Sequence, residues 1–206
     1  MTAAATLAGM ASGFADPTHD SQRTFRRLMD AMARPGRVVD LDVQLSPPVS
    51  GWEAAGAIAL TVLDFETPAW VPAGTEGDVL ATWLRFHCGC PVTRDTAEAA
   101  FAFARAEALP QLSDFNPGEA KYPERSTTLV VLCPALVGGG QVLLAGPGIP
   151  APFAIAPAGL SPDFWAAVIA DRQRFQLGID LVLACGQQII GLPRSTRITV
   201  CAPEGE

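Results

Sequence analysis

The pattern of hydrophobic and polar positions is clearest near the start of the chain, where it predicts a helix. Hydrophobic residues recur there at i, i+3, i+4 and i+7, the spacing of one helix face: Phe25, Leu28, Met29 and Met32. Asp20 or Ser21 can cap the first turn, because a short side-chain oxygen accepts hydrogen bonds from unpaired backbone N–H groups. Pro35 and Gly36 end the helix, and Arg34, which precedes the proline, is biased out of the helical conformation.

The same pattern predicts alternating helices and strands along the rest of the chain. Further helices are expected over Trp52–Leu63, Asp78–His87 and Ser161–Phe175, the last capped by Ser161. Extended segments are expected over Arg37–Val43, Pro68–Pro72, Thr127–Cys133, Gln141–Ala145, Phe153–Ile155, Ile179–Ala184, Gln188–Leu192 and Arg197–Cys201. Thr96–Ala106 stays open between helix and strand, because its alanines favour helix while its larger residues alternate. The sequence therefore predicts an α/β fold in which helices pack on the faces of a mixed β-sheet.

Length and composition indicate one domain with much buried surface. The chain has 206 residues, and we expect residues 16–206 to form a single α/β domain, preceded by a flexible or partner-docked arm over residues 1–15. Residues 1–14 lack the basic start and apolar centre of a secretory signal. Hydrophobic residues make up 49% of the chain and charged residues only 17%, which favours extensive burial, including a subunit interface.

The net charge of −7 argues against nucleic acid or an anionic membrane as a partner. Five of the 14 basic residues nevertheless lie close together: Arg23, Arg26, Arg27, Arg34 and Arg37. This concentration predicts either a solvated or partner-facing surface or a local anion site. No residue between Arg125 and Asp163 is charged, but repeated prolines and glycines there would break a membrane-spanning helix. We interpret that stretch as buried strands and turns.

Metal, cofactor and catalytic motifs give weaker signals. Five cysteines without a framework spacing favour reduced thiols and a cytoplasmic protein. The segment His87–Cys90 offers sulfur and nitrogen ligands for zinc, but the other cysteines lie in predicted strands, so we predict no metal. Lys121 is the sole lysine and stands in a turn-rich connection, so a pyridoxal phosphate Schiff base, or any other cofactor, is not expected. His19 and Asp20 could form an acid–base pair, although capping explains Asp20 equally well; no catalytic residue is identified.

Three segments carry candidate residues for an anion or ligand site. Arginine stands beside hydroxyl side chains in Tyr122–Ser126 and Pro193–Arg197, a combination that suits phosphate or phosphonate oxygens and equally an interface salt bridge. Gly146-Pro147-Gly148 follows a strand as phosphate-binding loops do, but it lacks the lysine and hydroxyl of a P-loop. Arg34, at the end of the first predicted helix, is added to the candidates from these three segments, which are Arg125, Ser126, Arg194, Gly146 and Gly148.

Six segments together resemble one protein family, the H subunit of bacterial carbon–phosphorus lyase (PhnH). They cover nearly the whole chain in order and spacing: Phe25–Gly36, Leu84–His87, Pro123-Glu124, Gly146–Ile149, Leu177–Leu181 and Leu192–Thr196. Each fragment alone is weak, whereas six in register are specific. One departure is Gln176, where we would expect proline; it affects a turn and no candidate site.

The resemblance implies a fold similar to that of pyridoxal-phosphate-dependent transferases without the cofactor site. It also implies a chain that pairs with itself when isolated and assembles with the G, I and J subunits into the lyase core complex. That complex displaces adenine from ATP with a phosphonate, giving a ribose 1-phosphonate 5-triphosphate, and the H subunit is associated with this first step.

Two classes of function follow from the resemblance, with a third behind them. The first is a non-catalytic assembly subunit. The second is a subunit that contacts the phosphonate or the ATP triphosphate directly through Arg34, Arg125 and Arg194. The third is an independent enzyme on a transferase-like fold, which would have to turn over substrate by itself.

Overall fold

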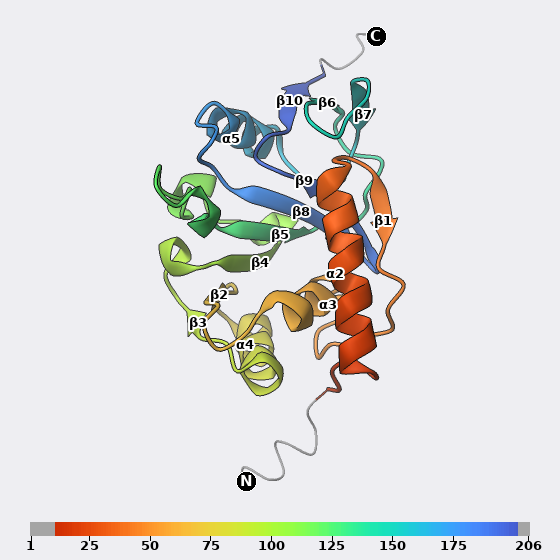
Figure 1. The fold of residues 1–206 in the computed structure, drawn as a ribbon, viewed down its shortest axis with the longest axis vertical. Helices are drawn as coiled ribbons and strands as arrows, with labels where there is room; N and C mark the ends of the chain where they lie inside the picture. The colour runs from red at the N-terminus through yellow and green to blue at the C-terminus, as the bar shows by residue number, and fades with distance from the viewer. Residues whose placement is uncertain (1–10, 202–206) are drawn as a thin grey trace, which may run out of the picture.

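The computed structural model describes residues 11–201, which fold around a seven-stranded β-sheet. Its strands are β1 (Val38–Asp40), β2 (Ala69–Trp70), β3 (Val92–Thr93), β4 (Phe101–Arg105), β5 (Thr128–Leu132), β8 (Asp180–Cys185) and β9 (Gln188–Leu192). They are ordered β1-β9-β8-β5-β4-β2-β3 (Figure 1). Strand β9 runs antiparallel to both of its neighbours, and the other adjacent pairs are parallel.

The central strands are buried on both faces because their side chains alternate between two hydrophobic cores. In β5, Val130 and Leu132 belong to one core, while Leu129 and Val131 belong to the other. A strand with an uninterrupted apolar sequence is typical of a parallel sheet that is covered on both sides. This burial explains the hydrophobic composition of the chain.

Helices cover one face of the sheet, and a helix with a second small sheet covers the other (Figure 1). The first face carries α2 (Pro17–Ala33), α3 (Glu53–Val62) and α4 (Thr75–Cys88). The second carries α5 (Pro162–Arg172) and a three-stranded sheet of β10 (Arg197–Val200), β6 (Val142–Ala145) and β7 (Phe153–Ile155), in that order. Within residues 11–201 there are also four short 3-10 helices: η1 (Thr96–Glu98), η2 (Ala106–Ala108), η3 (Leu112–Asp114) and η4 (Pro123–Arg125).

The predicted α/β class, a mixed sheet with helices on its faces, is confirmed, and the sheet is open and seven strands wide. The predicted strands over residues 127–133 and 141–145 both form, but they belong to different sheets, which the sequence pattern did not indicate. The ambiguous segment Thr96–Ala106 divides into the 3-10 turn η1 and the strand β4. Among the described residues, no helix is both long and apolar enough to cross a membrane.

Two expectations for the first helix are wrong. Helix α2 begins at Pro17, and its cap is Asp16, whose Oδ1 accepts from the His19 backbone N–H at 3.1 Å; the predicted caps lie inside the helix. The buried stripe consists of Thr24, Leu28 and Ala31, whereas Phe25 and Met29 are 49% and 44% exposed. The helix is turned this way because it packs closely on β9 at Gly191, where an added Cβ would lie 2.6 Å from the Ala31 carbonyl oxygen.

The ends of the other helices follow the chemistry of their caps. Helix α4 begins at Thr75, three residues before the predicted start. It ends at Cys88 and is followed by the capping residue Gly89, whose φ of 66° lies in the left-handed region that glycine adopts easily. Ser161 caps α5 as predicted, since its Oγ accepts from the Phe164 N–H at 3.1 Å. That helix ends at Arg172, three residues before the predicted end.

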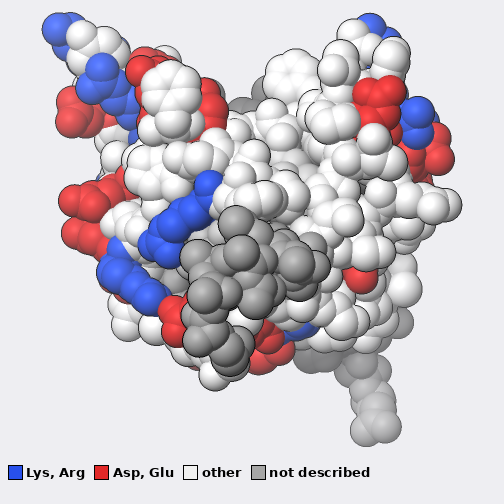
Figure 2. Space-filling view, turned by 90° about the horizontal axis from the view of Figure 1, so that it is seen from below, with Lys and Arg blue, Asp and Glu red and all other residues white. Residues whose placement is uncertain are grey.

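Residues 11–14, part of the predicted arm, pack against α4. The Ala11 carbonyl accepts a hydrogen bond from Trp83 Nε1 at 3.0 Å, and His87 Nε2 lies 3.1 Å from the same oxygen. Residues 1–10 lie outside the described part of the chain, so the expected flexible or partner-docked arm stays a prediction for them. Figure 2 views the molecule from this end: broad uncharged areas separate charged groups that lie mostly toward its margins.

Candidate functional site

Arg194, a candidate anion-binding residue, is engaged inside the protein. Its Nη2 lies 2.6 Å from Asp180 Oδ2, its Nη1 donates to the Pro123 carbonyl at 2.6 Å, and its backbone N–H donates to Asp180 Oδ1 at 2.7 Å. The side chains of Arg194 and Asp180 are each 17% exposed. Most of the guanidinium donors are therefore already used to join β8, the 193–197 segment and η4.

Arg172 forms a second internal network beside Arg194. Its Nη1 donates to the Ile179 carbonyl at 2.7 Å and to Asp171 Oδ2 at 3.0 Å, and its Nη2 donates to the Leu192 carbonyl at 3.1 Å. Asp171 Oδ2 also accepts from the Ile179 N–H at 3.1 Å. Burial lowers the pKa of Arg172, and the nearby carboxylates of Asp171 and Asp180 oppose that shift. The network ties α5 to β8 and β9.

Arg125 and Ser126 lie at the same corner as Arg194, but only Arg125 is open to solvent. Its guanidinium carbon lies 4.1 Å from the centre of the Tyr122 ring, and it forms no ion pair within residues 11–201. The Ser126 hydroxyl is buried without a hydrogen-bond partner in that part of the chain. The structure thus brings three predicted residues together and leaves one of them, Arg125, with free donors.

Gly146 and Gly148 are explained by close packing. An added Cβ at Gly146 would lie 2.9 Å from the Ser195 carbonyl oxygen, and one at Gly148 would lie 2.2 Å from the Ala33 carbonyl oxygen. Both glycines have positive φ values, 140° and 78°. The turn therefore packs between the end of α2 and the 193–197 segment. Gly148 lies close to Ala33 and Pro35, the two residues that flank Arg34 in the sequence.

The largest exposed cluster of arginines follows one side of α2. We define the α2 arginine face as Arg23, Arg26, Arg27 and Arg34. Arg34 Nη1 lies 2.6 Å from Asp30 Oδ1, and Arg23 Nη1 donates to the Asp42 carbonyl at 2.7 Å. Arg26 and Arg27 form no ion pair with any described residue.

A hollow of about 570 Å³ lies along the α2 arginine face, and all its lining residues belong to that one helix: His19, Gln22, Arg23, Arg26, Arg27, Asp30 and Arg34. Free guanidinium donors on this surface can receive carboxylate or phosphate oxygens. A single helix supplies only one wall, so this is an open cationic surface.

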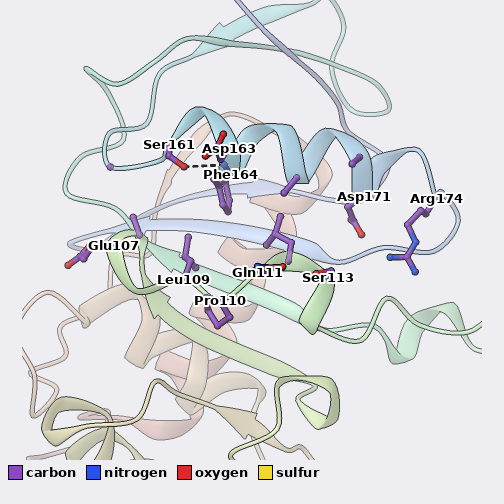
Figure 3. A pocket seen from close by; sticks show the side chains of 15 residues that line it. Glu107, Leu109, Pro110, Gln111, Ser113, Ser161, Asp163, Phe164, Asp171 and Arg174 are labelled. Carbon is purple, nitrogen blue, oxygen red and sulfur yellow. Dashed lines mark hydrogen bonds between the residues drawn. The ribbon is translucent and has the colours of Figure 1, made fainter.

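A groove of about 760 Å³ beside α5, which sequence reasoning missed, is larger than the hollow along α2 (Figure 3). We call it the α5 groove. Figure 3 shows α5 on one side and the 107–113 segment on the other, with Glu107 and Arg174 toward opposite ends. Its charged residues are Glu107, Asp163, Asp171 and Arg174. Because three of these four are acidic, the α5 groove is poorly suited to a polyanion.

The residues that could serve a metal or pyridoxal phosphate are badly placed. Residues 11–201 contain no group of three or more histidine, cysteine or acidic side chains arranged around one point. His87 is directed to Ala11, and a hydrogen bond links the thiols of Cys88 and Cys90, which lowers the pKa of Cys90. Lys121 is exposed, with its ammonium 5.0 Å from the Tyr122 ring centre. A Schiff-base lysine is normally enclosed with its cofactor, so Lys121 does not fit that role.

Comparison with known proteins gives a consistent result. Residues 12–199 match the family described as bacterial phosphonate metabolism protein (PhnH). The chain is 42% identical over 186 residues to "Alpha-D-ribose 1-methylphosphonate 5-triphosphate synthase subunit PhnH" of Rhizobium meliloti (strain 1021), covering 90% of this chain and 93% of the relative. It is 30% identical over 184 residues to "Putative C-P lyase subunit protein HtxG" of Stutzerimonas stutzeri, covering 87% and 86%.

Proposed function

Because the chain belongs to the family of bacterial phosphonate metabolism proteins (PhnH), we propose that it is a subunit of a carbon–phosphorus lyase core complex. In this role it supports transfer of a phosphonate onto the ribose of ATP with release of adenine, giving a ribose 1-phosphonate 5-triphosphate. The printed name of the Rhizobium relative describes a subunit of a synthase for such a compound. The family relationship is the observation that carries the proposal.

The chain contributes mainly to assembly, with the G, I and J subunits as its partners in the cytoplasm. The exposed apolar surface supports this part of the proposal, because large side chains stay accessible although the two cores are complete. Seven of them are the following: Phe25, Met29, Phe65, Val79, Phe86, Val137 and Phe175. A subunit that buries surface against partners carries such residues outside its own core.

The proposal extends to the fold and to the isolated chain. The open mixed sheet, covered on both faces, is compatible with a relationship to pyridoxal-phosphate-dependent transferases. The exposed position of Lys121 supports the further proposal that the cofactor site is lost. When separated from its partners, the chain is expected to pair with itself, which would shield part of the apolar surface.

Co-expression tests the assembly role directly. The chain is purified with the G, I and J subunits, and the isolated chain is measured by size-exclusion chromatography with light scattering. A stable multi-subunit particle together with an isolated dimer is the expected result. A chain that elutes apart from those subunits would overturn the proposed function.

Direct contact with the phosphonate or the ATP triphosphate is the second candidate function. It is favoured by Arg125, whose guanidinium has no carboxylate partner among the described residues, and by the exposed position of Arg34. Arg34→Ala and Arg125→Ala, with exposed Arg174→Ala as the matched control, separate the two functions. Loss of adenine release from an intact complex supports direct contact, whereas loss of the complex supports assembly.

A further inference from the structure

Helix α2 uses only part of its surface in the fold. Its buried stripe is Thr24, Leu28 and Ala31. At 100° per residue, Gln22, Arg26 and Ala33 point most nearly away from that stripe. Phe25 and Met29, at 49% and 44% exposure, lie toward one side, and the α2 arginine face lies toward the other. The outward surface of this helix is therefore apolar along one edge and cationic along the other.

The cationic edge is only partly neutralised by its surroundings, because Arg23 lies 3.9 Å from Asp42 Oδ2 while two of its four arginines have no ion pair among the described residues. Arg23 is spaced three and four residues from Arg26 and Arg27, and like charges at these spacings repel each other on a helix. Asp30 is paired with Arg34, and neither Arg26 nor Arg27 pairs with a described carboxylate. A chain of net charge −7 thus carries an excess of positive charge at one place on its surface, where four arginines meet two paired carboxylates. Such an excess attracts a partner of opposite charge.

The residue types on this surface are those of a protein interface. Phenylalanine, methionine and arginine are enriched where proteins meet, and an interface typically surrounds an apolar centre with a polar rim. Phe25 and Met29 can supply the apolar centre, while Arg26 and Arg27 supply the rim. A small polyanion would use only the arginines and would remain in contact with solvent, because the hollow has a single wall.

We infer that the outer surface of α2 docks onto an acidic surface with an apolar centre on another protein subunit of the complex. The inference rests on the proposed function and names the surface that performs it. A second copy of this chain fits less well, because a two-fold contact centred on α2 would bring arginines against arginines. A contact between α2 and an acidic patch elsewhere on a second copy would not close and would produce open chains.

The test is a charge reversal on the proposed surface, with a control that changes the net charge equally. The variant is Arg26→Glu with Arg27→Glu. The control is Arg174→Glu with Arg197→Glu, because these arginines are exposed, one just after α5 and one on β10, and form no ion pair with a described residue. Each double variant is co-expressed with the G, I and J subunits, and the fraction recovered in the complex is measured. Circular dichroism and urea unfolding of the isolated chains verify that both variants fold.

We expect the α2 double variant to be recovered in the complex at least tenfold less than the wild type, while the control matches the wild type. Raising the NaCl concentration should release the wild-type chain progressively, because salt screens charge pairs at a rim. If the α2 double variant assembles like the wild type, the inference is overturned while the proposed function stands. If the wild type does not assemble, the proposed function fails and the inference falls with it.

Two further measurements identify the rival occupants. Light scattering of the isolated chains tests for a second copy: a change in oligomeric state that is confined to the α2 double variant would assign the surface to self-association and overturn the inference. Calorimetric titration with inorganic triphosphate tests for a small polyanion. If the wild type and the control bind triphosphate, and the α2 double variant loses this binding but still assembles, the inference is also overturned.

Discussion

Two groups of arginines in this protein have opposite environments. Arg172 and Arg194 lie against the sheet, at 6% and 17% side-chain exposure, and donate to carboxylates and backbone carbonyls. Arg26 and Arg27 lie on the outside of α2 with no ion pair among the described residues. The first group joins segments of the fold, and the second has donors to offer another molecule.

The comparison teaches that arginine beside hydroxyl residues does not by itself indicate a ligand site. The segments around Arg194 and Arg125 have similar composition. Asp180 and the Pro123 carbonyl nevertheless occupy the guanidinium of Arg194, whereas the guanidinium of Arg125 is free of such partners within residues 11–201. What separates a structural arginine from a binding arginine is whether its donors are already satisfied. Substitutions in both groups of arginines test this distinction.

The largest effect is expected for Arg172→Ala. The substitution removes the charged partner of Asp171, which keeps only the Ile179 N–H as a donor among the described residues, and removes the guanidinium donors of the Ile179 and Leu192 carbonyls. Removal of one partner from a buried ion pair costs about 3 to 5 kcal/mol, so we expect a loss of that size in the free energy of unfolding. Urea unfolding followed by circular dichroism measures it.

A matched pair of exposed substitutions completes this test. Arg26→Gln with Arg27→Gln should change the free energy of unfolding by no more than about 0.5 kcal/mol, as for most surface positions. Equal losses for Arg172→Ala and for the α2 pair would remove the distinction between the two groups.

A smaller loss is expected for Arg194→Ala. This position is partly accessible, so water can replace some of the lost donors, and we expect the free energy of unfolding to fall by about 2 kcal/mol. Arg194→Lys should recover only part of it, because an ammonium group cannot reproduce the two-pronged contact with Asp180. If Arg194→Ala unfolds like the wild type but lowers phosphonate-dependent adenine release, Arg194 belongs with the binding arginines.

The smallest effect on stability is expected for Asp16, whose carboxylate caps the start of α2. Hydrogen bonds from the His19 backbone and side chain lower the pKa of Asp16 below its ordinary 3.8. A lowered folded-state pKa means that the cap stabilises the helix fully above about pH 4 and loses its contribution as the pH falls through the folded-state value. Wild type should therefore be more stable than Asp16→Ala at pH 7, and the difference should shrink by pH 3.

Thermal unfolding of both proteins at the two pH values checks this prediction. Asp16→Asn is the control, because asparagine also caps a helix but does not titrate in this range. Its stability relative to Asp16→Ala should be the same at both pH values. A difference between wild type and Asp16→Ala that is independent of pH would contradict the assigned cap.

Most of the fold could be predicted because local sequence determines it. The apolar runs of β5 and β8 and the cap at Ser161 are readable from neighbouring residues, and they form as expected. The orientation of α2 could not be predicted, because it depends on Gly191, which lies 160 positions after Ala31 and allows their backbones to approach. Periodicity identifies an apolar face but does not determine which part of a wide face is buried.

Less of the candidate site could be predicted. Composition alone identified the arginines of α2, and their exposure agrees with the expectation of a partner-facing or solvated surface. The engagement of Arg194 with Asp180 could not be read from the sequence, because Asp180 begins β8 whereas Arg194 lies in the turn between β9 and β10. The α5 groove gave no signal, since its walls come from two segments about fifty residues apart and neither carries a motif.

The pairing of β1 with β9 has a consequence for the order in which the protein can fold. Val38 pairs with Ile190, so the edge of the sheet closes only after almost the whole chain has left the ribosome. Helix α2 is synthesised early, yet its packing partner, Gly191, is among the last residues to appear. During synthesis, Ala31 therefore lacks the strand backbone on which it packs, and such non-local topologies fold slowly. Helix α2 must wait for strand β9 before its packing is complete.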